Sequence, residues 1–264
     1  MPWYSFDRIA PNYDRTRVVD PKVLHDFLLA FGEWFPPEEF PRALEIGVGT
    51  GRMAFPFANQ GYRVTGVDLS ERMLARLRHR RLASPPAPVD VLRADATRLP
   101  FQDRSFDLAY WVHVLHLIPE WRRAVDEVLR TLRAGGAVID LGTGNGREIP
   151  EVMRRYAEIL RTLGHPRPTV GVRRRAVVLE HLAARGLEVE LGTRRWRWKT
   201  GVPIGEALKH LDRRAYSATR YAPIAVHRRA MKELATWARA RWGPPGHVVV
   251  VPNELRVAIA RVRR

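Results

Sequence analysis

Three glycines at alternate positions, followed later by one acid, form the pattern in this sequence that points most directly to chemistry. Gly47, Gly49 and Gly51 follow one apolar run, and Asp68 ends the next apolar run. Glycine has no Cβ, so it lets the backbone turn sharply and approach a ligand closely. A carboxylate at the end of a buried strand can accept hydrogen bonds from both hydroxyls of a ribose. The pattern therefore predicts a site for a nucleoside-containing cofactor.

The spacing of the glycines separates two kinds of cofactor site. The dinucleotide pattern G-x-G-x-x-G would place its third glycine at position 52, which is occupied by Arg52. The observed pattern, E-x-G-x-G-x-G from Glu45, resembles motif I of class I S-adenosylmethionine (SAM) dependent methyltransferases. Asp68 is similar to their ribose-binding acid, and residues 95–107 and 132–136 resemble their adenine-side loop and the turn before strand five. The group that this order resembles includes the ubiquinone/menaquinone-biosynthesis methyltransferases.

The resemblance implies SAM as cofactor, S-adenosylhomocysteine as product and a small molecule as methyl acceptor. It also implies an α/β fold, in which a doubly wound, Rossmann-like sheet of seven strands is mostly parallel, has an antiparallel last strand and carries an inserted helical cap. The implied cofactor-binding residues are Tyr13, Arg17, Glu45, Gly47, Gly49, Gly51, Asp68, Leu69, Asp95, Ala96, Trp111 and Val112.

Each of these residues has an expected role. The glycine loop accommodates the methionine part of SAM, while Glu45 steadies the loop and offers negative charge to the ammonium group. Asp68 holds the ribose, with Leu69 against the adenine. Asp95, with the alanine after it, lies at the edge of the adenine ring, where its carboxylate can accept from the exocyclic amine. The backbone near Trp111 and the next valine is expected beside the reactive methyl group.

Methyl transfer from a sulfonium needs mainly positioning, so a catalytic base is an optional component of this site. The candidates are His113 and His116, three positions apart after the fourth expected strand, and Tyr13. An imidazole can remove a proton near neutral pH. The alternative is that both histidines hold the loop by hydrogen bonds to backbone. No metal site is expected, because two histidines lack a nearby third ligand.

The N-terminal stretch at residues 6–14 resembles a segment that folds over the cofactor in the same family. The resemblance implies that Tyr13 covers SAM and that Arg17 reaches its carboxylate. A surface helix whose aromatic side chains pack on the core is the alternative interpretation.

Strand and helix patterns alternate between residues 42 and 143, which is typical of a doubly wound parallel sheet with its ligand at the carboxyl ends of the strands. We expect a single domain, 1–264, with these parts: an N-terminal helical cover at 1–40, the cofactor-binding core at 41–143, cap segments at 144–175 and 203–242, and C-terminal strands at 187–198 and 254–262.

The formal charge of +17 leaves a second function open, because phosphate neutralisation by basic residues is the basis of nucleic-acid binding. The alternative function is therefore an RNA or other nucleic-acid methyltransferase. Two features oppose it: residues 111–114 are Trp-Val-His-Val rather than the Asn/Asp-Pro-Pro-Tyr of enzymes that methylate exocyclic base nitrogens, and there is no cysteine for cytosine C5 methylation. Arginine pairs are spread along the whole chain, which favours a compositional, thermophile-like origin of the charge. A SAM-binding protein without methylating activity is a third alternative.

The absence of cysteine excludes disulfides and cysteine-ligated metals. No apolar run approaches the length of a membrane span, and the first residues lack the pattern of a signal peptide. We therefore expect a cytoplasmic protein. The sequence does not predict its oligomeric state.

Overall fold

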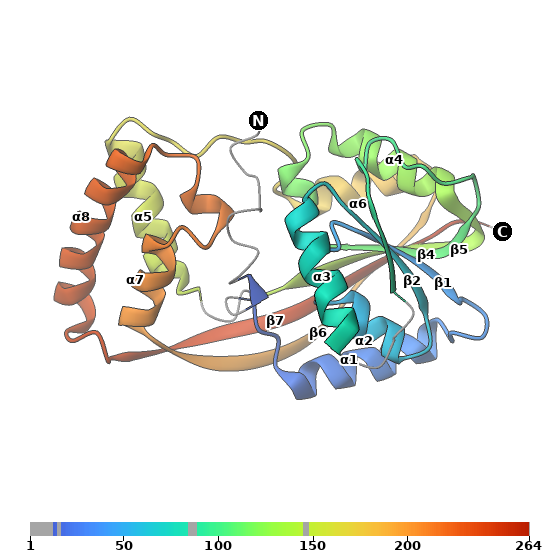
Figure 1. The fold of residues 1–264 in the computed structure, drawn as a ribbon, viewed down its shortest axis with the longest axis horizontal. Coiled ribbons are helices and arrows are strands. Elements are labelled where there is room, and N and C mark those ends of the chain that lie inside the picture. The colour runs from blue at the N-terminus through green and yellow to red at the C-terminus, as the bar shows by residue number, and fades with distance from the viewer. Residues whose placement is uncertain (1–12, 15–16, 84–88, 145–147, 264) are drawn as a thin grey trace. The chain divides into compact units, whose positions relative to one another are not determined.

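A computed structural model describes residues 13–14, 17–83, 89–144 and 148–263 of the chain (Figure 1). The strands are β1 (Arg42–Ile46), β2 (Arg63–Asp68), β3 (Val89–Arg93), β4 (Phe106–Val112), β5 (Leu132–Thr143), β6 (Glu188–Pro203) and β7 (Val248–Arg261). The helices are α1 (Pro21–Trp34), α2 (Ala54–Asn59), α3 (Glu71–Ala83), α4 (Trp121–Thr131), α5 (Pro150–Thr162), α6 (Arg175–Ala184), α7 (Ile204–Asp212) and α8 (Ile224–Trp242). Two short 3-10 turns are η3 (Leu115–Leu117) and η4 (Ser217–Thr219).

The seven strands form one sheet in the order β3-β2-β1-β4-β5-β7-β6. The pairs β1–β2, β2–β3, β1–β4 and β4–β5 are parallel, and β7 runs antiparallel to β5. The chain reverses its direction of winding between β1 and β4, and ligands of doubly wound sheets bind at such a reversal. The predicted fold class, including the antiparallel last strand, is confirmed.

The last two strands are longer than the sequence pattern indicated. We expected strands at 187–198 and 254–262, whereas β6 extends to Pro203 and β7 begins at Val248. Four consecutive valines, 248–251, favour an extended backbone because β-branched side chains pack well on a pleated surface. Pro252 lies inside β7 with its ring exposed, and it interrupted the expected alternation.

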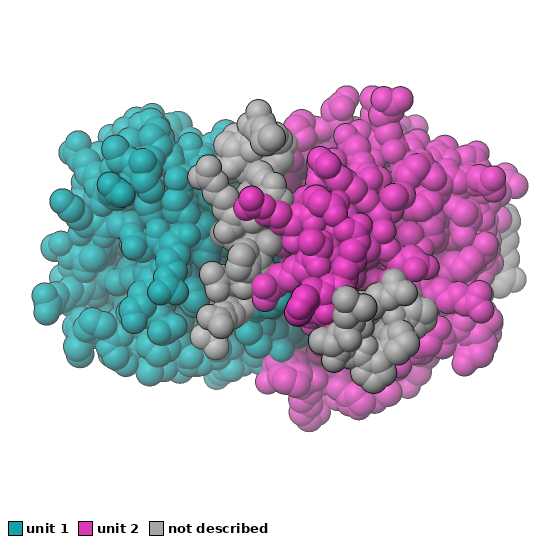
Figure 2. Space-filling model, in the orientation of Figure 1, with its two compact units in different colours: residues 1–19, 144–168, 197–253 teal, residues 20–143, 169–196, 254–264 magenta. Residues whose placement is uncertain are grey.

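The structure divides into two compact units (Figure 2). Unit 1 comprises residues 1–19, 144–168 and 197–253, and unit 2 comprises residues 20–143, 169–196 and 254–264. Strands β6 and β7 each contribute residues to both units. The expected cap segments fall largely in unit 1, whereas α1 of the expected N-terminal cover belongs to unit 2. The expectation of a single domain stays a prediction.

Each unit has its own apolar core. In unit 2, β1, β4 and β5 pack with α4 around Trp111 and Trp121, which are 2% and 6% exposed. In unit 1, α5, α7 and α8 pack around Tyr156 and Leu234, which are 1% and 0% exposed. Among the helices that the structure describes, none combines the length and the apolar character that a membrane crossing requires.

Candidate functional site

The glycine loop between β1 and α2 has the backbone conformation that its sequence predicts. Gly47, Gly49 and Gly51 have φ values of 69°, 56° and 77°, in the left-handed region that side chains with a Cβ rarely adopt. The amides of Gly47 and Val48 both donate to the carbonyl of Val67, at 2.8 and 3.0 Å. These bonds fix the start of the loop to the end of the neighbouring strand, β2.

Two of the glycines are also required for close packing within the protein, a role that the sequence pattern did not indicate. A Cβ at Gly47 would lie 2.5 Å from Cγ2 of Val114. A Cβ at Gly51 would lie 2.8 Å from the ring of Phe55 and 3.0 Å from Leu77. The segment after β4 therefore packs directly on the glycine loop.

Asp68, at the end of β2, is positioned by two backbone amides. Its Oδ2 accepts from the amide of Gly49 at 2.9 Å, and its Oδ1 accepts from the amide of Ser70 at 2.8 Å. An ionised carboxylate has about four acceptor positions, and hydroxyl groups such as those of a ribose are among the donors it can accept from. The next side chain, Leu69, is 59% exposed, which gives the site an apolar surface suited to an adenine ring. The role of Asp68 toward a ribose stays a prediction.

Glu45 lies buried beneath the glycine loop, with 3% of its surface exposed. Its Oε2 accepts from the hydroxyl of Tyr110 at 2.9 Å. Burial raises the pKa of Glu45 to about 8, although the Tyr110 hydrogen bond and the charge of Arg52 oppose this rise. The carboxyl group is therefore mostly protonated at neutral pH. Glu45 was expected to offer negative charge to an ammonium group. For this, attraction to the bound ammonium must offset the free-energy cost of a buried, ionised carboxylate.

Arg52 and Thr143 are functional candidates that the sequence reasoning missed. A terminal nitrogen of Arg52 lies 3.5 Å from Oγ1 of Thr143, at the end of β5, and its charge acts on Glu45. The available signal was a cation directly after the third glycine, which we used only to exclude the dinucleotide pattern. A guanidinium there is suited to bind the carboxylate of an amino-acid group.

The two candidate histidines differ in position. His113 precedes η3 and has a φ of 53°, so the two rings do not share a face of one helical turn. Its Nε2 lies 2.5 Å from the carbonyl oxygen of Thr143 and 3.1 Å from both the amide nitrogen and Oγ1 of the same residue. This geometry supports the alternative in which His113 holds the loop after β4. His116 is half-buried within η3, and its role as a base stays a prediction.

The side chain of Trp111 belongs to the core and not to the ligand site. It is 2% exposed, and its Nε1 donates to Oδ1 of Asp140 at 2.8 Å. Oδ2 of Asp140 accepts from Nε of Arg175 at 2.6 Å. The expected contact of a cofactor with the backbone of Trp111 and of the half-buried Val112 stays a prediction.

On the adenine side, Asp95 shapes its own loop. Its Oδ1 accepts from both the amide and the hydroxyl of Thr97, each at 2.9 Å. The carboxylate is exposed, so Oδ2 is the atom that can accept from an exocyclic amine. Ala96 is 8% exposed and packs in the core of unit 2.

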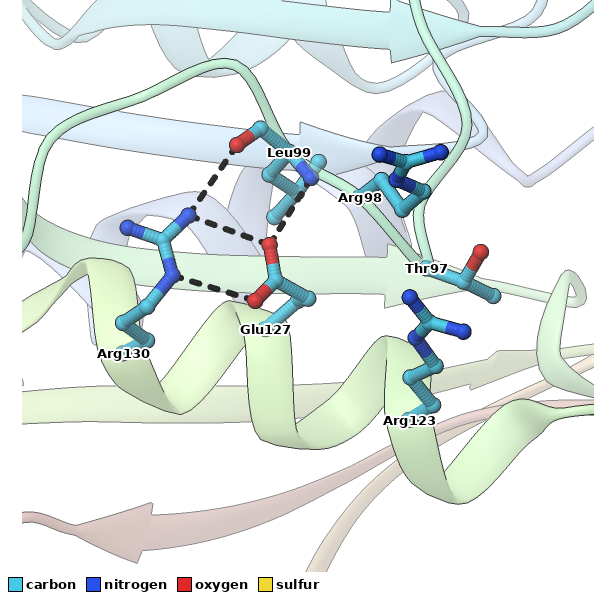
Figure 3. A pocket seen from close by; sticks show the side chains of 6 residues that line it. All are labelled: Thr97, Arg98, Leu99, Arg123, Glu127 and Arg130. Atoms are coloured by element: carbon cyan, nitrogen blue, oxygen red, sulfur yellow. Dashed lines mark hydrogen bonds and ion pairs between the residues drawn. The ribbon is translucent and has the colours of Figure 1, made fainter.

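A cavity of about 390 Å³ lies beside this loop and was not predicted (Figure 3). Glu127, from α4, accepts from the amide of Leu99 at 2.9 Å and from Arg130 at 3.0 and 3.1 Å. Arg130 in turn donates to the carbonyls of Leu99 and Phe101. The hydrogen bond from Arg130 is the main reason that the pKa of Glu127 lies below its ordinary value. This ion pair fixes the adenine-side loop to α4.

Tyr13 and Arg17 lie together in unit 1. The guanidinium of Arg17 is 4.4 Å from the ring centroid of Tyr13 and 5.6 Å from that of Tyr216. Arg17 also donates to the carbonyl of Ala215 at 3.5 Å, and it is 8% exposed. The two residues thus form one aromatic–cation cluster, and their roles toward SAM stay predictions. The rest of the segment that resembles a cofactor cover, 6–12, lies outside the described residues.

Comparison with known proteins gives a matching family. Residues 44–139 match the model of a methyltransferase domain. A phosphatidylethanolamine N-methyltransferase from Cereibacter sphaeroides is 40% identical over 99 residues, which are 37% of this chain and 48% of that protein. A demethylmenaquinone methyltransferase from Clavibacter sepedonicus is 37% identical over 136 residues, which are 51% of this chain and 54% of that protein. The chain thus spans about half the length of these relatives.

A solved structure extends the comparison to the fold of nearly the whole chain. The YcgJ protein from Bacillus subtilis superimposes with a TM-score of 0.61 at 19% identity, covering 91% of this chain and 99% of that one. At this identity the match concerns the fold alone. The segment that matches the methyltransferase model contains the glycine loop, Asp68 and Asp95.

Proposed function

We propose that this chain, whose residues 44–139 form a domain of the class I SAM-dependent methyltransferase family, transfers a methyl group from SAM to a small-molecule acceptor. One observation carries the proposal. The carboxylate of Asp68 reaches across from the end of β2 to the amide of Gly49, inside a loop whose three glycines all have positive φ. A strand-end acid joined to such a loop fits a nucleoside whose ribose is held by two hydroxyl contacts.

Four of the described residues each bind one part of SAM. Asp68 accepts from the ribose hydroxyls, and Leu69 covers one face of the adenine. Arg52 binds the carboxylate of the methionine part, while Glu45 meets its ammonium group. When bound, SAM supplies a methyl group that its sulfonium already activates. The protein therefore contributes positioning and exclusion of water, which can supply a large share of the rate.

The relatives support a small-molecule acceptor. One is named for phosphatidylethanolamine and another for demethylmenaquinone, and both are small molecules rather than nucleic acids. No finding favours the nucleic-acid alternative. The proposed reaction is in-line displacement at the methyl carbon, with S-adenosylhomocysteine as product. His116 and Tyr13 remain the candidates for a base where the acceptor must lose a proton.

The first experiment is a calorimetric titration of the full chain with SAM, S-adenosylhomocysteine and NAD in parallel. We expect binding in the micromolar range for the first two ligands and none for NAD. Binding of NAD alone would mean that the glycine loop holds a pyrophosphate, and the proposal would fall. If the protein shows no binding of any of the three ligands, it should be denatured and analysed by mass spectrometry, because a co-purified cofactor would prevent binding of added ligand.

The second experiment tests turnover with SAM that carries a labelled methyl group. The label should move from SAM into extracted small molecules and not into tRNA or rRNA. Label in RNA would overturn the choice of acceptor while leaving the cofactor assignment intact. Tight SAM binding without transfer to any acceptor pool would point to a SAM-binding protein that does not methylate.

A further inference from the structure

One face of β7 within unit 1 is uncovered. Val251 packs in the helical core and is 3% exposed, and Asn253, two residues further along β7, is 6% exposed. Val248 and Val250, which alternate with them, are 52% and 60% exposed. Helices α5, α7 and α8 lie on one side of the strands, as Figure 1 shows. The two valines therefore face away from the helices that supply the core of this unit.

The neighbouring strand, β6, repeats this alternation. Val202 is 2% exposed and belongs to the helical core, whereas Arg197, Lys199 and Gly201 are exposed. A Cβ at Gly201 would lie 3.0 Å from Cγ1 of Val248, so these two residues share one face. We call the set Arg197, Lys199, Gly201, Val248 and Val250 the ribbon face. It combines two exposed β-branched side chains with two cations.

The unit that carries the ribbon face also holds most of the excess charge. Unit 1 contains 19 Lys and Arg residues against 8 Asp and Glu residues, which gives +11 of the chain's +17. Unit 2 is larger, yet its 26 basic and 20 acidic residues leave only +6. Unit 1 as a whole is therefore strongly positive.

We propose that the ribbon face docks on an anionic lipid surface. Apolar side chains beside cations are the combination that binds the boundary between headgroups and acyl chains, where valines enter the apolar layer and Lys and Arg pair with lipid phosphates. Single exposed apolar residues are ordinary on protein surfaces. Here two of them, on β7, lie on the same face of the sheet as two cations on β6, in the more basic of the two units.

Two other occupants fit the ribbon face less well. A second copy of the chain would bring two units of +11 together, and like charge opposes that association. A single-stranded nucleic acid needs aromatic side chains for base stacking, and none of the five residues of the ribbon face is aromatic. Trp196 and Trp198, which flank Arg197 on β6, are both half-buried.

The test is co-sedimentation of the full chain with vesicles of phosphatidylcholine, with and without phosphatidylglycerol. Binding is expected only with the anionic lipid, and it should weaken as salt screens the charges. In the variant Val248→Asp/Val250→Asp, the partition coefficient between vesicles and solution should fall at least about tenfold. The variant loses apolar contact with the lipid and gains negative charge, which the anionic lipid repels. In Arg197→Gln/Lys199→Gln it should fall about five-fold for each cation removed.

The matched control is Leu29→Asp/Leu92→Asp. These leucines are 51% and 40% exposed and lie on α1 and β3, so the control makes the same chemical change in unit 2. The control should bind vesicles as the unmodified chain does. SAM titration of every variant shows that each is folded, and it separates failure of the docking proposal from failure of the proposed function.

Three outcomes would overturn the proposal. Vesicle binding that survives Val248→Asp/Val250→Asp would place the contact elsewhere. Equal loss in the control would make the effect one of net charge. A change in the oligomeric state of Val248→Asp/Val250→Asp, or a loss of oligonucleotide binding in the same variant without effect on vesicles, would assign the face to a second copy or to a nucleic acid.

Discussion

Each unit buries one tyrosine hydroxyl against an ionisable side chain, and the two pairs respond to pH in opposite directions. In unit 2 the hydroxyl of Tyr110 donates to Glu45 at 2.9 Å, and burial raises the pKa of the acid to about 8. In unit 1 the hydroxyl of Tyr156 lies 2.6 Å from Nδ1 of His227, and burial lowers the pKa of the base. Both environments favour the neutral form, so the same physical cause has opposite signs for an acid and a base.

The two pairs differ in their surroundings, and this difference distinguishes a ligand site from a structural core. Glu45 lies below the glycine loop and within the field of Arg52, so a ligand with its own charges can change its protonation. His227 is 1% exposed, and its Nε2 donates to the carbonyl of Asp212 at 3.0 Å. Both of its ring nitrogens are thus bonded inside the helical core. We interpret the pair in unit 1 as structural and the pair in unit 2 as part of the cofactor site.

The largest expected effect is on the pH dependence of stability in Glu45→Gln. Because the folded pKa of about 8 exceeds the unfolded value of 4.5, the folded state binds the proton more tightly. The unmodified chain should therefore lose stability as the pH rises from 4.5 to 8. Glutamine removes this loss, so the variant should gain about 4 kcal/mol relative to the unmodified chain on going from pH 5 to pH 9.

Urea denaturation of both proteins at pH 5 and pH 9 measures this difference. The quantity that matters is the change in relative stability between the two pH values, and not the stability at either one. If the two proteins keep the same relative stability, then Glu45 is not held neutral by burial and the contrast between the units is lost.

The next effect concerns cofactor affinity in Asp68→Ala. Removal of the carboxylate should weaken SAM binding about 100-fold, because hydrogen bonds to a charged group contribute roughly 1.5–3 kcal/mol each. The measurement is calorimetric titration, with circular dichroism to show that the fold is kept. Asp26→Ala is the control, since that acid forms only an exposed ion pair with Lys22 and should leave the affinity unchanged. Unchanged affinity in Asp68→Ala would mean that the ribose lies elsewhere.

Tyr156→Phe tests the structural interpretation of the pair in unit 1. The change leaves Nδ1 of His227 buried without its hydroxyl donor, which should cost about 1–3 kcal/mol of unfolding free energy. SAM affinity should stay as it is. A variant of full stability but weakened SAM binding would contradict the assignment of this pair to the core.

The smallest expected effect is that of Leu69→Ala. The leucine is 59% exposed, so its truncation opens no cavity, and folding stability should change by less than about 0.5 kcal/mol. SAM affinity should fall about five-fold through lost contact with the adenine. The same truncation at Leu29 on α1, which is 51% exposed, is the control. Equal SAM affinity in both variants would remove Leu69 from the site.

Local patterns in the sequence were sufficient for much of unit 2. Glycine at three alternate positions required positive φ, and each of the three has it. Asp20 directly before Pro21 is a local start signal for α1, and its Oδ1 accepts from the amides of Lys22 and Val23. Alternating strand and helix periods were enough to predict the parallel sheet. Such signals are readable because each one acts over a few neighbouring residues.

Contacts between distant residues were decided only by the tertiary structure. Nothing near His113 in the sequence indicates Thr143, and nothing near Trp111 indicates Asp140, because pairs about 30 residues apart leave no periodic pattern. The pKa of Glu45 follows from its burial under a loop that closes in three dimensions.

The net charge of the chain can be read from the sequence, but its distribution between the two units depends on the tertiary structure. Along the chain, arginines are scattered, which favoured a purely compositional explanation. Three separate segments assemble into unit 1, and this assembly places +11 of the +17 there. The sequence by itself determined the cofactor motif and the order of the sheet, since both depend on local pattern. The distribution of charge, the ribbon face and the partners of the histidines depended on which distant segments the fold brings together.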